Sequence, residues 1–498
     1  MRSLRWTVAK NALSNIVRGG ATAIVAVALP HFLVHSLDRD RFAAWSLILQ
    51  IAAYASFLDF GLQTAIARFV AQALELGKHE HVRKLIETAF AMLSIAALIS
   101  LALLLLIVFH AGIFFYGVPS SILHEFQVAA LIMALGAVLL LPLSTFTGVL
   151  IGMHQNEFTA YAVGGSRLIG ATIAIIASHY TRSLITIALC VAVPNLLGGL
   201  LQMYIVGQRL ASARLERLAI DRNAAVGFLH YCAGLTVWAF GMLLVSGLDI
   251  TIVGHYQFES AGYYAVAATL TSIFASANSS ILSALLAPFA AMQARGRLDQ
   301  MRVIVIHATR INTFMNVAVT AIVIAYGKML LGLWVGEIYA KQAYPVLVVL
   351  MATQTLRLFA SGYSIALIAT GYQNSGIFPV LIEAVVNLVM SLYLVQRRGA
   401  LGVAYGSFIG AVVAIPALFV FCVGIKEGLN ISRFDLGFRG ILVGMLPVLP
   451  AFACAILVIR LHQFRLLPIV GWLVSIVIGF FVFKLTQRQW STATLAAR

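Results

Sequence analysis

The residues of this chain that could do chemistry are ionisable side chains placed inside long apolar runs. A charged side chain at the centre of a bilayer costs about 2.5–3.5 kcal/mol on insertion scales. Such residues therefore face a wet cavity or a partner of opposite charge, and they mark functional sites by default. Nine of them occur here: Arg18, Asp59, Arg68, Arg167, Asp249, Arg310, Lys328, Arg357 and Glu383.

The arginines of this set predict a binding site for an anionic group. Guanidinium groups bind phosphate-like oxygens through paired, charge-assisted hydrogen bonds, and low-dielectric walls strengthen the attraction. We therefore expect the substrate to be bound by Arg18, Arg167, Arg310 and Arg357. Other roles stay open at this point. Arg18 and Arg310 could reach the head groups at the inner interface, and Arg167 could pair with Glu383 as a structural contact.

The acidic members of the set predict ion coupling. A carboxylate held away from water can take up and release a proton, and it can also bind Na⁺. We expect this role of Asp59, Asp249 or Glu383. The alternative is a helix-capping or interhelical hydrogen-bond role, which the position of Asp249 near a helix end favours more than that of Asp59.

The composition explains what must position these side chains. Of 498 residues, 61% are hydrophobic and only 10% are charged, whereas a soluble domain carries about 25% charged residues. The mean hydropathy is +0.98. Such a chain needs the bilayer as its solvent, which excludes a soluble enzyme, a nucleic-acid-binding protein and a secreted disulfide scaffold. The four cysteines lie inside apolar runs, so we expect core residues and no metal or cofactor.

A spanning helix needs about 20 mostly apolar residues, and the chain offers about fourteen such segments. The sequence therefore predicts an all-α polytopic membrane protein whose first span is not a cleaved signal peptide. Short connections leave no room for a soluble domain. The segments are 11–35, 42–71, 86–109, 126–150, 158–178, 183–207, 224–254, 260–290, 303–333, 343–370, 376–396, 400–424, 439–459 and 466–486.

The charges in the loops predict the orientation. Alternate loops, counted from the N-terminus, carry nineteen Lys and Arg residues, and the opposite loops carry eight. Basic residues concentrate on the cytoplasmic side. Both termini are therefore expected in the cytoplasm, and the net charge of +16 reflects topology and not a nucleic-acid partner.

Short pieces of the chain repeat at an offset of about 220 residues, as expected for a transporter built from parallel repeats. Phe69-Val70-Ala71 followed by Gly77-Lys78 returns as Phe289-Ala290-Ala291 followed by Gly296-Arg297, and Gly152 with Gln155-Asn156 returns as Gly371 with Gln373-Asn374. We expect one six-helix bundle at 1–212, a second at 213–425, and two additional helices with a cytoplasmic tail at 426–498. The alternative is that all basic, Gly-containing cytoplasmic turns look alike.

Two stretches give the chain a family resemblance. Asp59-Phe60-Gly61-Leu62 continues to Ala67-Arg68-Phe69-Val70-Ala71, and Asp249-Ile250-Thr251-Ile252-Val253-Gly254 is followed by Ala261-Gly262-Tyr263-Tyr264-Ala265. From roughly residue 8 to 425 the chain resembles the Wzx-type polysaccharide flippases of the multidrug/oligosaccharidyl-lipid/polysaccharide (MOP) exporter superfamily.

This resemblance implies a V-shaped, MATE-like pair of bundles around a central cavity in the bacterial inner membrane. It implies transfer of undecaprenyl-pyrophosphate-linked oligosaccharide repeat units to the periplasmic leaflet by alternating access, for O-antigen, capsule or exopolysaccharide. The pathway's polymerase and chain-length proteins would be partners. The four arginines would then contact the pyrophosphate or the sugars.

Three other functions are considered for the same set of residues. The chain has no GxxxxGK[ST] phosphate loop, so ATP is not its energy source. A multidrug or organic-cation antiporter would need acidic residues where this chain has arginines. A lipid II flippase is separated poorly by sequence alone. A membrane polymerase or ligase needs a large outer loop, so we expect a transporter and not an enzyme.

Overall fold

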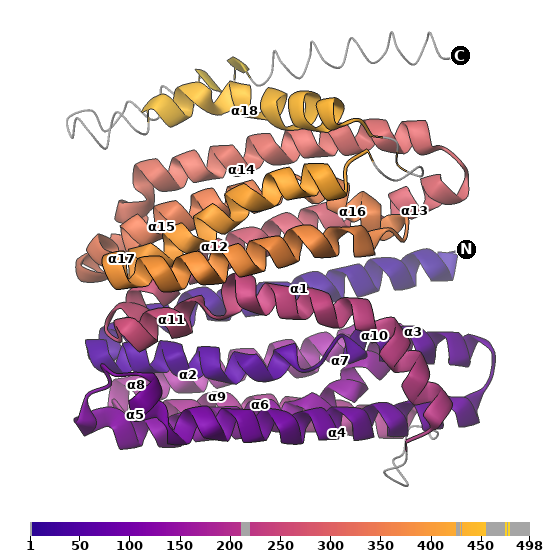
Figure 1. The fold of residues 1–498 in the computed structure, drawn as a ribbon. Helices are drawn as coiled ribbons and strands as arrows, with labels where there is room; N and C mark the ends of the chain where they lie inside the picture. Colours follow the sequence, from indigo (N-terminus) through magenta and orange to yellow (C-terminus); the bar gives the residue numbers. More distant parts are fainter. Residues whose placement is uncertain are drawn as a thin grey trace. The chain divides into compact units, whose positions relative to one another are not determined.

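The computed structural model describes residues 2–210, 220–424, 429, 431–454, 474–475 and 477–478. The regular structure in these residues is helical (Figure 1), as the apolar runs predicted. The helices form two compact units. Unit 1 comprises Met1–Val266 and Val395–Ala400, and unit 2 comprises Ala267–Leu394 and Leu401–Arg498.

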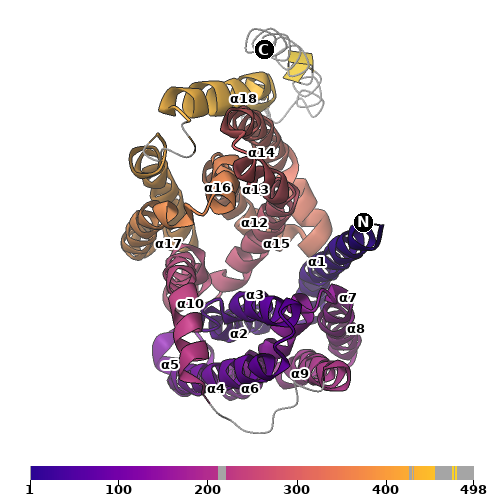
Figure 2. The same ribbon diagram turned by 90° about the vertical axis from the view of Figure 1, so that its right-hand side faces the viewer.

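Unit 1 is organised around α6 (Ser120–Gly152), which packs against α2 (Arg39–Phe57), α3 (Leu62–Glu75), α4 (His79–Phe109) and α9 (Leu184–Arg209). In Figure 2, α6 lies between α4 and α9. The helix has no strongly polar face, as expected where its sides meet other helices or lipid. The other elements are α1 (Arg2–Ser36), α5 (Ala111–Phe114), α7 (Asn156–Thr159), the π-helix η1 (Ala160–Gly164), α8 (Gly165–Tyr180), α10 (Arg222–Met242), the π-helix η3 (Leu243–Gly247), α11 (Asp249–Tyr256) and the start of α12 (Ser260–Ser283).

Unit 2 is organised around α14 (Leu298–Val335), which packs against α15 (Glu337–Leu358), α16 (Ser361–Ala369) and the π-helix η5 (Asp435–Leu442). Figure 1 shows α14 beside the segment labelled α18. The other elements are the rest of α12, α13 (Leu286–Ala294), the 3₁₀ helix η4 (Gln373–Gly376), α17 (Ile377–Phe421), α18 (Val443–Met445) and the 3₁₀ helix η6 (Leu446–Val448).

The predicted spans are found at the expected places as far as residue 454. Among the described residues, ten helices are long and apolar enough to cross a membrane, or up to twelve if each of two bent pairs is one span. α17 counts once, although its backbone leaves helical geometry at Gly399 (φ 56°, ψ −140°). It therefore joins the spans predicted at 376–396 and 400–424. The span predicted at 466–486 lies outside the described residues.

The predicted domain division at residues 212 and 425 stays a prediction. Unit 1 extends to Val266 because α10 packs on α3 and α4. Compact packing and evolutionary repeats are different properties, so this packing boundary does not decide where one repeat ends.

The turns that match in sequence also match in backbone conformation. Gly77 and Gly296 have φ values of 67° and 68°. The N–H groups of Lys78 and Arg297 donate to carbonyls five residues back over 3.0 and 2.9 Å. This is the helix-ending motif that requires a left-handed residue, which glycine supplies without strain. The two turns therefore share one helix-ending conformation, and the internal repeat stays a prediction.

In the second matched pair the backbone conformation and the residue identities align differently. The left-handed residue is His154 (φ 58°) in one turn and Gly371 (φ 79°) in the other. The following N–H groups, of Gln155 and Tyr372, each donate to a carbonyl five residues back over 2.9 Å. Gly371 therefore matches His154 and not Gly152, because backbone conformation, not residue identity, defines the position.

Close packing of the two halves of α17 depends on Gly406. A Cβ atom at this position would lie 2.5 Å from the backbone nitrogen of Ser391. We expect Gly406→Ala to lower the free energy of unfolding by about 1–3 kcal/mol, because the backbone cannot move aside cheaply. The measurement is the thermal midpoint of the purified protein in detergent. Gly227→Ala in α10 is the control, since nothing lies within 4 Å of its added methyl, and an unchanged midpoint in Gly406→Ala would contradict the prediction.

Candidate functional site

The structure brings two of the predicted site residues into direct contact. Arg357, near the end of α15, donates from Nε to Oε1 of Glu383 in α17 over 2.5 Å. Their side chains are only 16% and 10% exposed. Because both groups lose most of their hydration, each is stable there only while the other balances its charge. One residue came from the predicted binding set and the other from the predicted coupling set.

This ion pair lies beside a break in its span. α15 ends at Leu358 and α16 begins at Ser361, with a bend of 41°. The Leu358 carbonyl accepts from Nδ2 of Asn312 over 2.6 Å and from Oγ of Ser361 over 2.9 Å. Irregular backbone at membrane depth persists only where other groups satisfy it. These two side chains therefore fix the chain next to Arg357.

A stripe of polar side chains runs along α14, and only Arg310 in it was singled out from the sequence. Asn278 of α12 donates from Nδ2 to Oδ1 of Asn312 over 2.5 Å and of Asn316 over 2.9 Å. The missed signal was spacing, since polar residues three or four apart share one helix face. The buried members are Thr309, Arg310, Asn312, Thr313, Asn316 and Thr320.

Arg310 binds the neighbouring π-helix η5 through one nitrogen, and a second nitrogen of its guanidinium makes no part of that contact. It is 5% exposed, and its Nε donates to the Arg439 carbonyl of η5 over 2.8 Å. Asp435, at the start of η5, pairs with Arg302 over 2.8 Å and with Arg439 over 3.0 Å. These contacts fix η5 on α14. Nη1 of Arg310 is buried and has no hydrogen-bond partner within the described part of the chain, so it could bind an anion.

Asp59 lies in the break between α2 and α3. Phe60 (φ 51°) and Gly61 (φ 76°) turn the chain there, and the two helices are bent by 40°. The carboxylate interacts with the backbone N–H of Gln63 in the first turn of α3, which is the capping role weighed above. Its Oδ1 is buried without a hydrogen-bond partner among the residues described. That oxygen could take a proton or a cation.

Asp249 begins α11, and one residue separates it from the end of the π-helix η3. It is 6% exposed, and its Oδ2 accepts from the Tyr264 hydroxyl of α12 over 2.9 Å. Gln50 of α2 donates to the Gly247 carbonyl over 2.6 Å. The contact with Tyr264 is an interhelical hydrogen bond, the structural alternative for this residue.

The remaining predicted residues lie on α1 and α8. Arg167 is exposed, and its Nη1 donates to Oγ1 of Thr22 over 3.0 Å, which links α8 to α1. Glu383 is paired with Arg357 within unit 2, a partner that the sequence did not suggest. Arg18 belongs to α1, but its side chain lies outside the described residues.

The predicted site residues therefore do not all contact one another. Arg357 and Glu383 are in contact, whereas Arg310 on α14 contacts the Arg439 carbonyl of η5. Asp59, Asp249 and Arg167 each have separate local partners. Within the described ranges, no group of three or more His, Cys, Asp or Glu side chains could hold a metal ion.

Comparisons with known proteins agree with this arrangement of helices. The family described as polysaccharide biosynthesis protein matches residues 8–293. The lipid II flippase MurJ in an inward closed conformation is similar in structure, with a TM-score of 0.69, 13% identity, and coverage of 96% of this chain and 99% of that one. A comparison with curated proteins finds no match.

Two further solved structures share the fold. An inward-facing multidrug resistance MATE family transporter of the MOP superfamily has a TM-score of 0.65 and 15% identity, covering 80% of this chain and 96% of its own. A MOP superfamily transporter from Pyrococcus furiosus, described as having a binding pocket of reverse polarity, has a TM-score of 0.57 and 13% identity, covering 87% and 96%. At these identities the likeness shows the fold.

Proposed function

Because this chain belongs to the polysaccharide biosynthesis protein family, we propose that it is a flippase for undecaprenyl-pyrophosphate-linked oligosaccharide repeat units. It would carry them from the cytoplasmic to the periplasmic leaflet by alternating access, for O-antigen, capsule or exopolysaccharide. The observation that carries the proposal is the buried pair of Arg357 and Glu383 beside a helix break. A buried charge pair within apolar helices is expensive, and such pairs mark transport sites.

In this proposal the substrate and Glu383 compete for Arg357. A pyrophosphate offers planar oxygens that a guanidinium binds at two points. When it displaces Glu383, the freed carboxylate must be neutralised by H⁺ or Na⁺ before it can remain buried. Return of the Arg357–Glu383 pair would expel the anion. Arg310 would contribute Nη1, and Arg18 and Arg167 would contact the pyrophosphate or the sugars from unit 1.

The proposed flippase would lie in the bacterial inner membrane and would act together with other proteins of its pathway. The loop charges favour both termini in the cytoplasm of a bacterial inner membrane, with bundles at 1–212 and 213–425 and two helices after them. The chain would make and break no covalent bond, so it has no catalytic residue. The polymerase and chain-length proteins of the pathway would take up its product.

The direct test is to delete the gene and follow the lipid-linked repeat units. We expect them to accumulate on the inner leaflet and the surface polymer to disappear, with recovery when the gene is restored. Unchanged polymer would refute the proposal. Loss of peptidoglycan precursor transfer instead would identify a lipid II flippase, and loss of drug resistance alone would identify a multidrug antiporter.

The proposed coupling of transport to an ion gradient can be tested at Asp59. Asp59→Asn keeps an oxygen for the Gln63 N–H but loses the charge. We expect gradient-driven transport in proteoliposomes to fall by about tenfold or more while the thermal midpoint stays near wild type. Glu75→Gln in α3 is the control, because it removes an exposed carboxylate from the same unit. If Asp59→Asn still responds fully to an imposed H⁺ or Na⁺ gradient, Asp59 is only a helix cap.

A further inference from the structure

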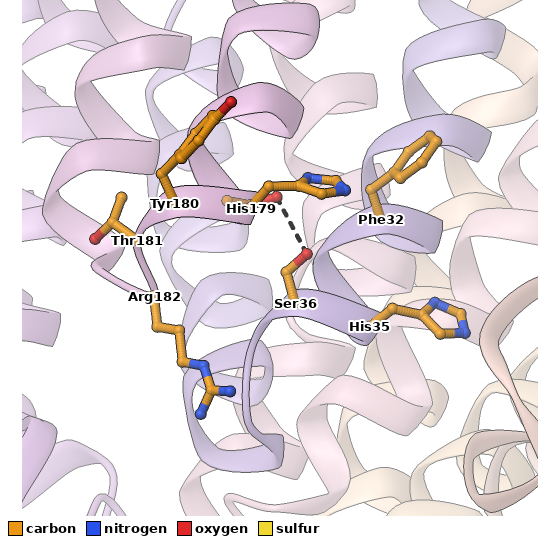
Figure 3. A pocket seen from close by; sticks show the side chains of 8 residues that line it. Phe32, His35, Ser36, His179, Tyr180, Thr181 and Arg182 are labelled. Atoms are coloured by element: carbon orange, nitrogen blue, oxygen red, sulfur yellow. Dashed lines mark hydrogen bonds between the residues drawn. The ribbon is translucent and has the colours of Figure 1, made fainter.

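A pocket of about 370 Å³ lies between the ends of α1 and α8 in unit 1. Phe32, His35 and Ser36 of α1 form one wall, and Ser178 and His179 of α8 with the following turn form the other. Figure 3 shows the His179 ring directed toward Phe32, and the hydrogen bond from Ser178 to Ser36 that joins the two walls over 3.3 Å. None of these residues belongs to the predicted transport site.

The walls of this pocket are held in place by a second set of contacts. Arg41 binds Asp38 over 2.6 Å and Glu125 of α6 over 3.1 Å. The other oxygen of Glu125 accepts the backbone N–H of Leu184 over 2.7 Å. The turn after α1 and the turn after α8 are thereby tied to the same carboxylate. The pocket is therefore formed before any ligand arrives, which lowers the entropic cost of binding.

Two histidines in the pocket present hydrogen-bond acceptors. Nδ1 of His35 is 2.7 Å from the His31 carbonyl, and Nδ1 of His179 is 2.9 Å from the Ile175 carbonyl. A carbonyl oxygen can only accept, so Nδ1 carries the hydrogen in both rings. In the neutral imidazole the other nitrogen, Nε2, is then an acceptor. Both rings therefore favour a ligand that donates hydrogen bonds.

The pocket also offers exposed aromatic faces. Tyr180 is 88% exposed and Phe32 is 38% exposed, and the Phe32 ring centre lies 6.3 Å from that of His179. Exposed rings beside hydroxyls provide an apolar face together with polar edges. A sugar ring has the matching chemistry, with one face of C–H bonds and hydroxyls that donate and accept around its rim.

The same groups disfavour a phosphate or a phospholipid head group. An unprotonated phosphate oxygen only accepts hydrogen bonds, so it cannot pair with Nε2 of either ring in its neutral form, whereas a sugar hydroxyl can. Arg182, which also lines the pocket, has the Asp38 carboxylate in its electrostatic surroundings. A neutral, hydroxyl-rich ligand therefore suits the pocket better than an anion.

We propose that this pocket between α1 and α8 binds a sugar ring of the transported glycan on the membrane face opposite the cytoplasm. The inference rests on the proposed function, and on the predicted orientation that places the ends of these helices outside. It would hold the glycan after its pyrophosphate has left the arginines.

The test places a benzophenone amino acid at Tyr180 of the full-length protein in cells that make their polymer. Tyr180 is exposed, so the change does not disturb packing. After illumination, mass spectrometry identifies what is attached. We expect sugar-bearing adducts at Tyr180, reduced severalfold when His35→Phe and His179→Phe remove both acceptors but keep a ring. The same photoprobe at Tyr204 of α9, 65% exposed, should give phospholipid adducts alone.

The outcomes separate this inference from the proposed function. Only phospholipid adducts, or none, at Tyr180 in cells that still export polymer would overturn the pocket assignment and leave the flippase intact. An adduct that persists undiminished in the double histidine variant would also overturn it. Failure of the gene deletion to alter lipid-linked repeat units would instead refute the flippase, whatever is attached at Tyr180.

Discussion

Replacing Arg357 by glutamine is expected to lower export of the lipid-linked glycan by about tenfold or more, because the substrate loses its buried cation. The same change leaves Glu383 buried without its partner. Breaking one side of a buried pair costs about 3–5 kcal/mol, so the thermal midpoint should also fall. Export is measured as surface polymer at matched protein levels. Lys341→Gln is the control, because Lys341 lies exposed on the same helix and should behave as wild type.

The double variant Arg357→Gln with Glu383→Gln separates function from stability. With both charges removed, no uncompensated charge remains, and the thermal midpoint should recover most of the loss. Export should stay low, because the anion still has no guanidinium to bind. If the double variant exports normally, the pair is structural and the proposed exchange of partners is wrong. If Arg357→Gln alone exports normally, Arg357 does not bind the substrate.

Replacing Arg310 is expected to have the second large effect, because one side chain serves two purposes. Arg310→Met removes the donor to the Arg439 carbonyl and leaves that oxygen unsatisfied, which costs about 1–3 kcal/mol. Arg310→Lys keeps a charge, but all its donors lie on one nitrogen, so it cannot bind the Arg439 carbonyl and also reach an anion at the position of Nη1. We expect both variants to lose export, and Arg310→Met to loosen η5 as well.

Hydrogen exchange over residues 435–448 measures how firmly Arg310 holds η5, and export measures whether Arg310 binds the substrate. Arg310→Lys should protect this segment more than Arg310→Met while both export poorly. Lys328→Met is the matched control, since Lys328 lies exposed on the same helix. Normal export by Arg310→Met would remove Arg310 from the substrate site. Unchanged exchange in that variant would show that its bond to Arg439 does not hold η5.

Much of the architecture was predictable because the bilayer imposes a simple rule. Every backbone polar group at membrane depth must be satisfied within a helix, so each span appears in the sequence as a long apolar run. For the same reason a single charged residue within an apolar run, such as Arg357 or Asp59, is easily recognised in the sequence. The breaks at both residues were not predicted. Apolar character continues across them, and the bends come from backbone conformation at Phe60 and Gly61 and from the carbonyl contacts around Leu358.

The sequence by itself determined the class of protein, the positions of its spans as far as residue 454 and the short list of charges inside them. The family match now shows that the chain belongs to the polysaccharide biosynthesis protein family, and the solved structures show that it shares their fold. Only the tertiary structure decided who contacts whom: that Glu383 is the partner of Arg357, that Arg310 holds η5, and that α1 and α8 enclose a pocket. The physical reason is that hydropathy reports whether a helix is stable in lipid, and this depends only on the residues of that helix. Pairing between helices depends on small-residue contacts and hydrogen bonds, which join residues far apart in the chain.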